Sequence, residues 1–165
     1  MTTTKPQPLR RERSQSTERA LKLWVVLARA FAAVEARART DAARRGLTLA
    51  ELGVLEALQH KGPLLLGELQ AKLLVSSGGI TYLVDRLQGR GLVRRRRSPD
   101  DRRACYVELT RAGARLIAAE FPGHARCIEQ TMSGLGPREQ REAIQLLRTL
   151  GLAAAEMEPC TAPEP

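Results

Sequence analysis

Residues 66–87 read LGELQAKLLVSSGGITYLVDRL, and this stretch determines the fold. It contains two short segments with helical spacing of apolar residues, about 66–74 and 80–88, on either side of a Ser/Gly turn at 76–79. The residues expected to face inward are Leu69 and Leu73 in the first segment and Ile80, Val84 and Leu87 in the second. Two short helices joined by a tight turn are typical of a helix-turn-helix.

Beyond Gly91 the apolar period changes from helical spacing to two. Residues 92–97 are expected to form a strand, 98–101 a turn and 104–109 an antiparallel partner strand. In the partner strand the inward face is assigned to Cys105, Val107 and Leu109. A hairpin that directly follows a helix-turn-helix is a wing.

Helices are expected on both sides of this winged unit. A long helix from about Thr17 to Arg45 carries two neighbouring apolar stripes, more than one core requires, and Gly46 ends it. Thr48 and Glu51 fit the capping box of the next helix, which ends at 61–63. The members of the two stripes are Leu21, Trp24, Val25, Ala28, Phe31 and Ala32 in one, and Leu23, Leu27, Ala30 and Val34 in the other.

After the wing, Thr110 is expected to cap a helix that Phe121-Pro122-Gly123 kinks or breaks. Pro137 begins a last helix that runs to about Met157. The predicted fold is mostly α with a small β-hairpin wing, a winged helix-turn-helix flanked by N- and C-terminal dimerisation helices. The predicted divisions are a disordered basic arm 1–15, a dimerisation helix 16–46, the DNA-binding unit 47–110, dimerisation helices 111–157 and a disordered tail 158–165.

The composition agrees with a helical protein that binds a polyanion. With 165 residues one domain is expected, and 3% aromatic residues leave the core to Leu and Ala. The net charge of +9 favours nucleic acid over a membrane as partner. No apolar run approaches the roughly 20 residues of a membrane span, and we expect no secretory signal and a cytoplasmic location. The three cysteines are widely spaced without a C-x-x-C, so no disulfide framework, metal or cofactor is expected.

The strongest functional signal is the charge between residues 86 and 103, where eight arginines and two aspartates give +6. A charge run alone is equally compatible with a solvated face, but this one flanks a recognition helix and continues into a hairpin. The planar guanidinium suits phosphates and narrow minor grooves. In the recognition helix, Ser76 or Ser77 caps the N-terminus, while Thr81 and Tyr82 lie off the apolar stripe and are candidate base or sugar contacts.

These residues resemble the multiple antibiotic resistance regulator, or MarR, family over about residues 17–157. The similarity is carried by 77–87, by Arg90-Gly-Leu-Val93, and by Asp100-Asp-Arg-Arg103 leading to 107–110. The resemblance implies a homodimer on a pseudo-palindromic operator in double-stranded DNA, with Arg102 in the minor groove and Asp100 bracing the wing. The DNA contacts that it and the charge pattern indicate are Ser76, Ser77, Gly79, Thr81, Tyr82, Arg86, Arg94, Arg95, Arg96, Arg97, Arg102 and Arg103.

Family members are commonly repressors released by small phenolic or lipophilic effectors or by cysteine oxidation. The stretch 76–82 with Phe121-Pro-Gly-His124 is most similar to the branch that responds to hydroquinone- and catechol-type compounds. The peroxide-sensing branch has a cysteine early in its first long helix, whereas this chain has none before Cys105. Trp24 and Phe31 are interpreted as core residues, or alternatively as the lining of an effector pocket.

Other interpretations remain open at this point. Cys105 is more readily a buried apolar residue than a sensor, and Cys127 with His124 offers too few ligands for a metal. An architectural DNA-binding protein without an effector is the alternative function, and no catalytic motif indicates an enzyme. Repression or activation depends on where the operator lies relative to a promoter.

Overall fold

The computed structural model describes residues 14–73, 76–97 and 105–158. The chain divides into two units, residues 1–37 and residues 38–165. The described part of the first unit is helical throughout, as the larger share of α1 (Gln15–Arg44). The predicted arm 1–15 and tail 158–165 lie almost wholly outside the described residues, so their disorder stays a prediction.

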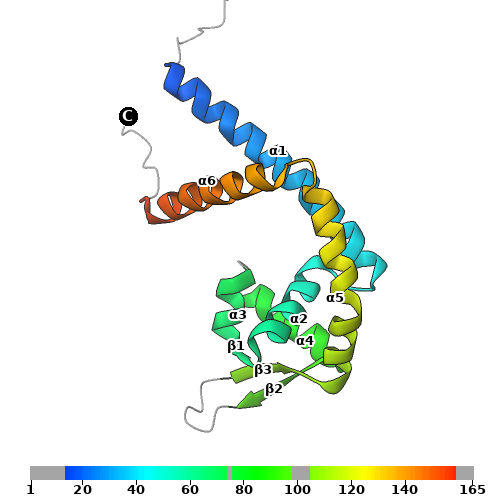
Figure 1. Cartoon of the computed structure of the whole chain (residues 1–165). Coiled ribbons are helices and arrows are strands. Elements are labelled where there is room, and N and C mark those ends of the chain that lie inside the picture. The colour runs from blue at the N-terminus through cyan, green and yellow to red at the C-terminus, as the bar shows by residue number, and fades with distance from the viewer. Residues whose placement is uncertain (1–13, 74–75, 98–104, 159–165) are drawn as a thin grey trace, which may run out of the picture. The chain divides into compact units, whose positions relative to one another are not determined.

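The second unit contains the winged helix-turn-helix that the sequence predicts (Figure 1). The core is formed mainly by α2 (Leu49–Lys61), α3 (Leu66–Leu73), α4 (Ser77–Gly89) and the first half of α5 (Arg111–Met132), together with residues of the strands. The wing consists of β2 (Val93–Arg97) and β3 (Cys105–Leu109), and α6 (Pro137–Glu156) follows α5. Apart from the end of α5, each of these elements begins and ends within about three residues of its predicted bounds.

A third strand joins the wing, which the sequence analysis did not predict. β1 (Leu64–Leu65) pairs antiparallel with β3, opposite Val107 and Tyr106, so the sheet order is β1-β3-β2. Two residues carry no measurable period, and no element was predicted for Leu64 and Leu65. The extra strand covers one edge of β3 and ties the wing to the segment between α2 and α3.

Aliphatic side chains from every layer of the second unit meet in one core, as the low aromatic content predicts. Val107 is fully buried on the inner face of β3, whereas Cys105 and Leu109 on the same face are only partly buried. The largest side chains of the core with under 2% exposure are Leu52, Leu55, Leu69, Ile80, Leu87, Ile117, Val54, Val84, Val93 and Val107.

The start of α5 is fastened tightly to the base of the wing. The Thr110 side chain caps α5 by accepting from the Gly113 N–H at 3.0 Å, and it donates to the Gly91 carbonyl at 2.7 Å. A Cβ at position 113 would lie 1.9 Å from the Leu92 carbonyl oxygen. Only glycine therefore allows α5 to approach the strand this closely.

Of the kink or break expected at Pro122, the break is wrong, because α5 continues through the proline as one helix (Figure 1). Proline removes one helical hydrogen bond, but neighbouring turns can hold a helix together when they are anchored. Here Ile117 before the proline and His124 after it are both buried against the rest of the unit.

The apolar stripes of α1 and α6 lie exposed in the single chain. Trp24 is 66% exposed and Phe31 is 64% exposed, so the interpretation that they belong to this chain's own core is wrong. No residue of α6 is buried. Among the described residues the large apolar side chains exposed on these two helices are Leu21, Leu23, Trp24, Val25, Val26, Phe31, Ile144, Leu146, Leu147, Leu150 and Leu152.

Candidate nucleic-acid interface

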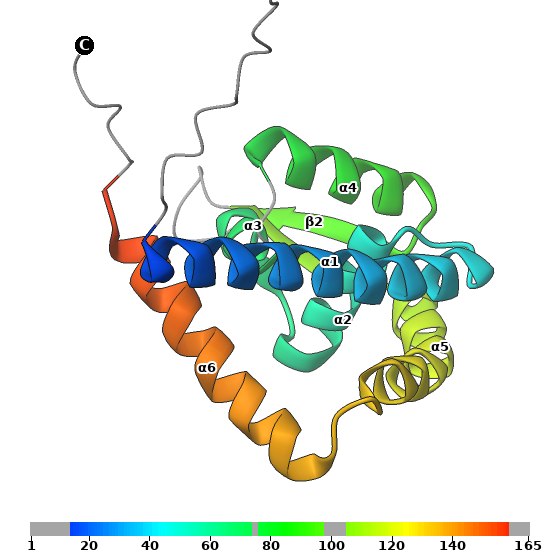
Figure 2. The same cartoon turned by 90° about the horizontal axis from the view of Figure 1, so that it is seen from above.

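The recognition helix α4 buries one face and presents the other. Ser76 is its N-cap, and its Oγ accepts a hydrogen bond from the Gly79 N–H at 3.1 Å, which confirms that this serine caps the helix. The helix lies beside β2 (Figure 2). On the outward face Tyr82 is 60% exposed and Thr81 is exposed too, as their position off the apolar stripe predicts. Small N-terminal residues and exposed polar side chains on one helix suit close approach to a groove.

Arg86 and Arg90 are held by a carboxylate that belongs to α2. Arg86 Nη2 lies 3.2 Å and Arg90 Nη1 lies 3.7 Å from Glu51 Oε1. The sequence pattern indicates Glu51 only as a capping residue, and the structure confirms that cap, with Thr48 N–H donating to Oε2 at 2.7 Å. The ion pairs could not be read from the sequence, because residues 35 positions apart meet only through the packing of α4 on α2.

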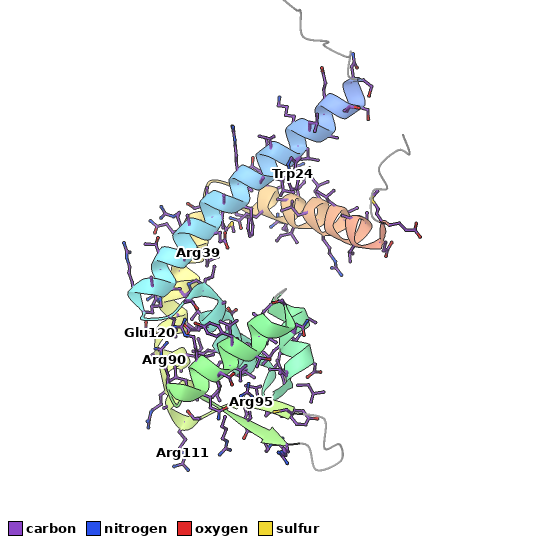
Figure 3. The ribbon with its side chains drawn as sticks, turned by 180° about the vertical axis from the view of Figure 1, so that it is seen from behind. Trp24, Arg39, Arg90, Arg95, Arg111 and Glu120 are labelled. Carbon is purple, nitrogen blue, oxygen red and sulfur yellow. The ribbon has the colours of Figure 1, made fainter. Side chains whose placement is uncertain are left out.

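The four consecutive arginines of β2 alternate between the two faces of the wing, as strand geometry requires. Arg94 donates to Glu108 at 2.7 Å, and Arg96 lies 3.5 Å from the same carboxylate. Arg96 also lies over the ring of Tyr106, 5.0 Å from its centroid. Arg95, on the other face, pairs with Asp85 of α4, and Figure 3 shows its side chain at the wing. Arg97 has no ion-pair partner among the described residues.

The turn of the wing lies outside the described residues. Asp100, Arg102 and Arg103 fall in the segment 98–104, so their predicted roles at the wing stay predictions. Nor is the side chain of Ser77 among those that can be described. The described candidates on α4 and β2 nevertheless come together on neighbouring elements, and the Arg95–Asp85 pair joins the two directly.

A buried polar cluster joins the end of α1 to α5, and the sequence analysis missed it. The Arg45 guanidinium donates to both carboxylate oxygens of Asp41, at 3.0 and 2.9 Å, and to Glu120 at 2.7 Å. Figure 3 shows Glu120 on α5. His124 Nδ1 lies 2.8 Å from Asp41 Oδ2, and because a carboxylate only accepts, Nδ1 carries the proton. A Cβ at Gly123 would lie 2.8 Å from the Arg45 guanidinium, so glycine makes room for it.

The charges of this cluster stabilise one another. The hydrogen bond from Arg45 holds the pKa of Asp41 below its ordinary value, against the opposing effect of burial, and the bond from His124 acts in the same direction. The two carboxylates in turn raise the pKa of Arg45. An acidic and a basic residue at i and i+4 in a helix was the only signal in the sequence, and it gave no hint of His124.

The described part of the chain contains neither a cluster of metal ligands nor a helix that could span a membrane. Within it, no three His, Cys, Asp or Glu side chains gather closely enough to hold a metal ion. Cys105 and Cys127 are free thiols, each half-buried. None of the described helices combines the length and apolar character that crossing a bilayer requires.

The comparisons with known proteins agree with this geometry. A model of the MarR family matches residues 45–104, which cover the helix-turn-helix and the first strand of the wing. The HTH-type transcriptional regulator MhqR of Bacillus subtilis is 37% identical over 140 residues, which cover 85% of this chain and 97% of MhqR.

Two solved structures extend the comparison to three dimensions. The structure of Bordetella bronchiseptica BpsR, from work on regulation of its DNA binding by 6-hydroxynicotinic acid, is 27% identical with a TM-score of 0.72, covering 79% of this chain and 98% of that one. Sco3205 from Streptomyces coelicolor, a MarR family transcriptional regulator in complex with DNA, is 23% identical with a TM-score of 0.77. Its match covers 84% of this chain and 91% of Sco3205, and it supports the fold alone. The wing, the recognition helix and the near full-length similarity to MhqR together mean that this chain belongs to the MarR family of winged helix-turn-helix transcriptional regulators.

Proposed function

We propose that the protein is a homodimeric repressor that binds a pseudo-palindromic operator and is released from it by a small aromatic effector. The observation that carries the proposal is the outward face of α4, where Thr81 and Tyr82 lie exposed beside the arginine-rich strand β2. In this function Thr81 and Tyr82 contact base edges or sugars, while Arg97 and its neighbours bind phosphates. A protein that binds operator DNA acts in the compartment that contains the chromosome.

The wing supplies the second contact of each protomer. Arg102 enters the minor groove beside the recognition helix, where a narrow groove attracts a guanidinium. Arg103 binds phosphate, and Asp100 braces the turn by pairing with an arginine or accepting turn amides. Replacing Arg102 by alanine is expected to weaken operator binding by about 1–3 kcal/mol per half-site, the scale of one specific groove contact. Unchanged operator affinity in that variant would contradict the minor-groove role.

The dimer is formed by the terminal helices. The exposed apolar stripes of α1 and α6 are larger than a single soluble chain leaves uncovered, and a symmetric interface would bury them. The predicted dimerisation helices 16–46 and 111–157 contain both stripes. Two recognition helices related by a two-fold axis require half-sites about 34–36 Å apart.

The effector is a phenol, a quinone or a hydroxylated aromatic acid. This part of the proposal is supported by the similarity to BpsR, which is regulated by 6-hydroxynicotinic acid, and by the aromatic residues Trp24 and Phe31 on α1. An aromatic ring in a site lined by such side chains is bound by stacking and apolar burial.

One selection experiment tests these steps together. Bound sequences are selected from random duplex DNA, and the enriched site is then challenged with a panel of phenols, quinones and hydroxylated aromatic acids. We expect a two-fold symmetric site preferred about 10³-fold or more over random duplex, with release by at least one compound. Binding without preference would instead mean an architectural DNA-binding protein, and chemical turnover of a panel compound would mean an enzyme. Sedimentation showing only monomer would contradict the dimer.

A further inference from the structure

Glu51 is buried more completely than a capping residue needs to be. Its exposure is 0%, although most capping carboxylates lie at the surface of the first helical turn. Its Oε2 accepts from the Thr48 N–H at 2.7 Å and from the Thr48 hydroxyl at 3.0 Å. Within the described residues its Oε1 is buried without a hydrogen bond, and it forms ion pairs with the guanidinium groups of Arg86 and Arg90. A buried carboxylate requires such compensation, so the arginines are part of its environment.

Both of these arginines come from the end of the recognition helix. Arg86 lies in the last turn of α4 and Arg90 is its C-cap, so the two side chains extend from the same turn toward α2. Arg86 also lies over the Tyr82 ring, with its Cζ 5.8 Å from the ring centroid. A line of contacts therefore runs from the buried Glu51 through Arg86 to the exposed ring of Tyr82.

We propose that Glu51 is a positioning residue for DNA recognition, which acts through Arg86 on Tyr82 rather than by touching DNA. By holding the Arg86 guanidinium, Glu51 fixes the place of the Tyr82 ring on the outward face of α4. It also withholds the charge of Arg86 from phosphates, because a guanidinium paired with a carboxylate gains less from a second anion. Arg86 is then a support for the recognition surface, in place of the phosphate contact that its sequence position indicates. This inference rests on the proposed DNA binding through α4.

The Glu51→Gln variant keeps the helix cap but removes the negative charge of the side chain. The glutamine oxygen still accepts from the Thr48 N–H, but its amide NH₂ then faces two guanidinium groups that also only donate. Arg86 and Arg90 are released from their anchor, and Tyr82 loses its fixed neighbour. We expect sequence preference to fall while nonspecific binding to DNA rises, because each protomer gains a positive charge that is free to bind phosphate.

The measurement is the affinity of the full chain for its selected site and for a scrambled duplex, across a series of salt concentrations. For Glu51→Gln the ratio of the two affinities is expected to fall about tenfold, the scale of one lost base contact. The dependence of log affinity on log salt is expected to steepen by about 0.9 for each newly bound phosphate. The matched control is Glu56→Gln, on the same helix, which makes the same charge change without an ion pair among the described residues. It should leave the ratio unchanged.

A second variant keeps the test decisive if Glu51→Gln unfolds. Arg86→Gln leaves the capping box intact and removes the same link from the other side. We expect a similar loss of sequence preference with little change in salt dependence, since the charge of Arg86 is already matched by Glu51. If Arg86 is a free phosphate contact, its removal lowers the slope by about 0.9 per protomer and weakens both duplexes equally.

The outcomes distinguish this inference from the function on which it rests. If the wild-type protein shows no sequence preference, both are overturned. If the wild type prefers its site but Glu51→Gln keeps that preference, or loses affinity for both duplexes by the same factor, only the positioning role is overturned. A double variant, Glu51→Gln with Arg86→Gln, should lose no more preference than either single change, because both act on one line of contacts.

Discussion

Replacing Asp41 by asparagine tests whether the polar cluster at the end of α1 stabilises the second unit. Asparagine has the same shape, but it lacks the negative charge of the carboxylate to which Arg45 and His124 both bond. Only one of its two terminal atoms accepts a hydrogen bond, so the NH₂ group must face a donor of Arg45 or of His124. The side chains of Asp41 and His124 are about nine-tenths buried, and water cannot readily replace the lost partner.

The expected loss follows from the three contacts of the carboxylate, at 3.0, 2.9 and 2.8 Å. Breaking a buried ion pair by removing one partner costs about 3–5 kcal/mol. Arg45 keeps its bond to Glu120, which reduces that penalty. We therefore expect Asp41→Asn to lower the free energy of unfolding by about 2–4 kcal/mol near neutral pH.

The pH dependence has a definite sign. The pKa of Asp41 is lower in the folded protein than its ordinary value of 3.8, so the folded state binds its proton less readily than the unfolded state. The stabilisation is complete above pH about 4 and is lost as the pH falls through the lowered pKa. The difference in stability between wild type and Asp41→Asn should therefore shrink as the pH falls below about 4.

The assay is urea unfolding followed by circular dichroism at fixed protein concentration, since dimer stability depends on concentration. Asp85→Asn is the control, because its exposed pair with Arg95 should contribute less than about 1 kcal/mol. A loss below about 0.5 kcal/mol in Asp41→Asn, the range of ordinary surface changes, would refute the reasoning.

In thermal unfolding, Gly113→Ala should cost at least about 3 kcal/mol of stability or prevent folding, because the new Cβ meets the Leu92 carbonyl. The control is Gly67→Ala, which has open space around the new Cβ and should be neutral or stabilising by up to about 1 kcal/mol. Arg97→Ala should flatten the salt dependence of DNA binding by up to about 0.9 per protomer, and Arg94→Ala by less, because Glu108 already matches that charge; equal slopes would contradict the distinction. A variant in which Cys105, Cys127 and Cys160 are all replaced should still be released from DNA by the effector in a gel-shift assay. Loss of release in a variant that folds and binds DNA would indicate a thiol sensor.

Local signals in the sequence predicted most of the elements and most of their ends. The capping box at Thr48, the cap at Thr110 and the proline at 137 each depend on residues within one helical turn, and the structure confirms all three. The expected break at Pro122 was wrong because it was based on the local preference of proline alone, without any tertiary contact. His124, in the turn that follows the proline, is held by Asp41, which lies 83 residues away in the sequence.

The candidate site was predicted as a list of positions rather than as an arrangement. Charge and helical period were enough to place Thr81 and Tyr82 on the outward face. They could not identify Glu51 as the partner of Arg86, because that contact depends on how α2 packs against α4. For the same reason the exposed stripes of α1 were assigned partly to a core that a single chain does not contain.

The ion pairs change what the basic cluster means for DNA binding. From the sequence, every arginine between 86 and 97 counts equally toward the attraction of a polyanion. In the structure, Glu51, Asp85 and Glu108 each lie against at least one of them, and all three carboxylates lie outside the run of charge itself. Paired arginines hold the recognition helix and the wing in place, whereas an unpaired one adds to the field that draws in DNA. The same residue type therefore serves two purposes within one surface, and net charge alone overstates how much of it is available to phosphate.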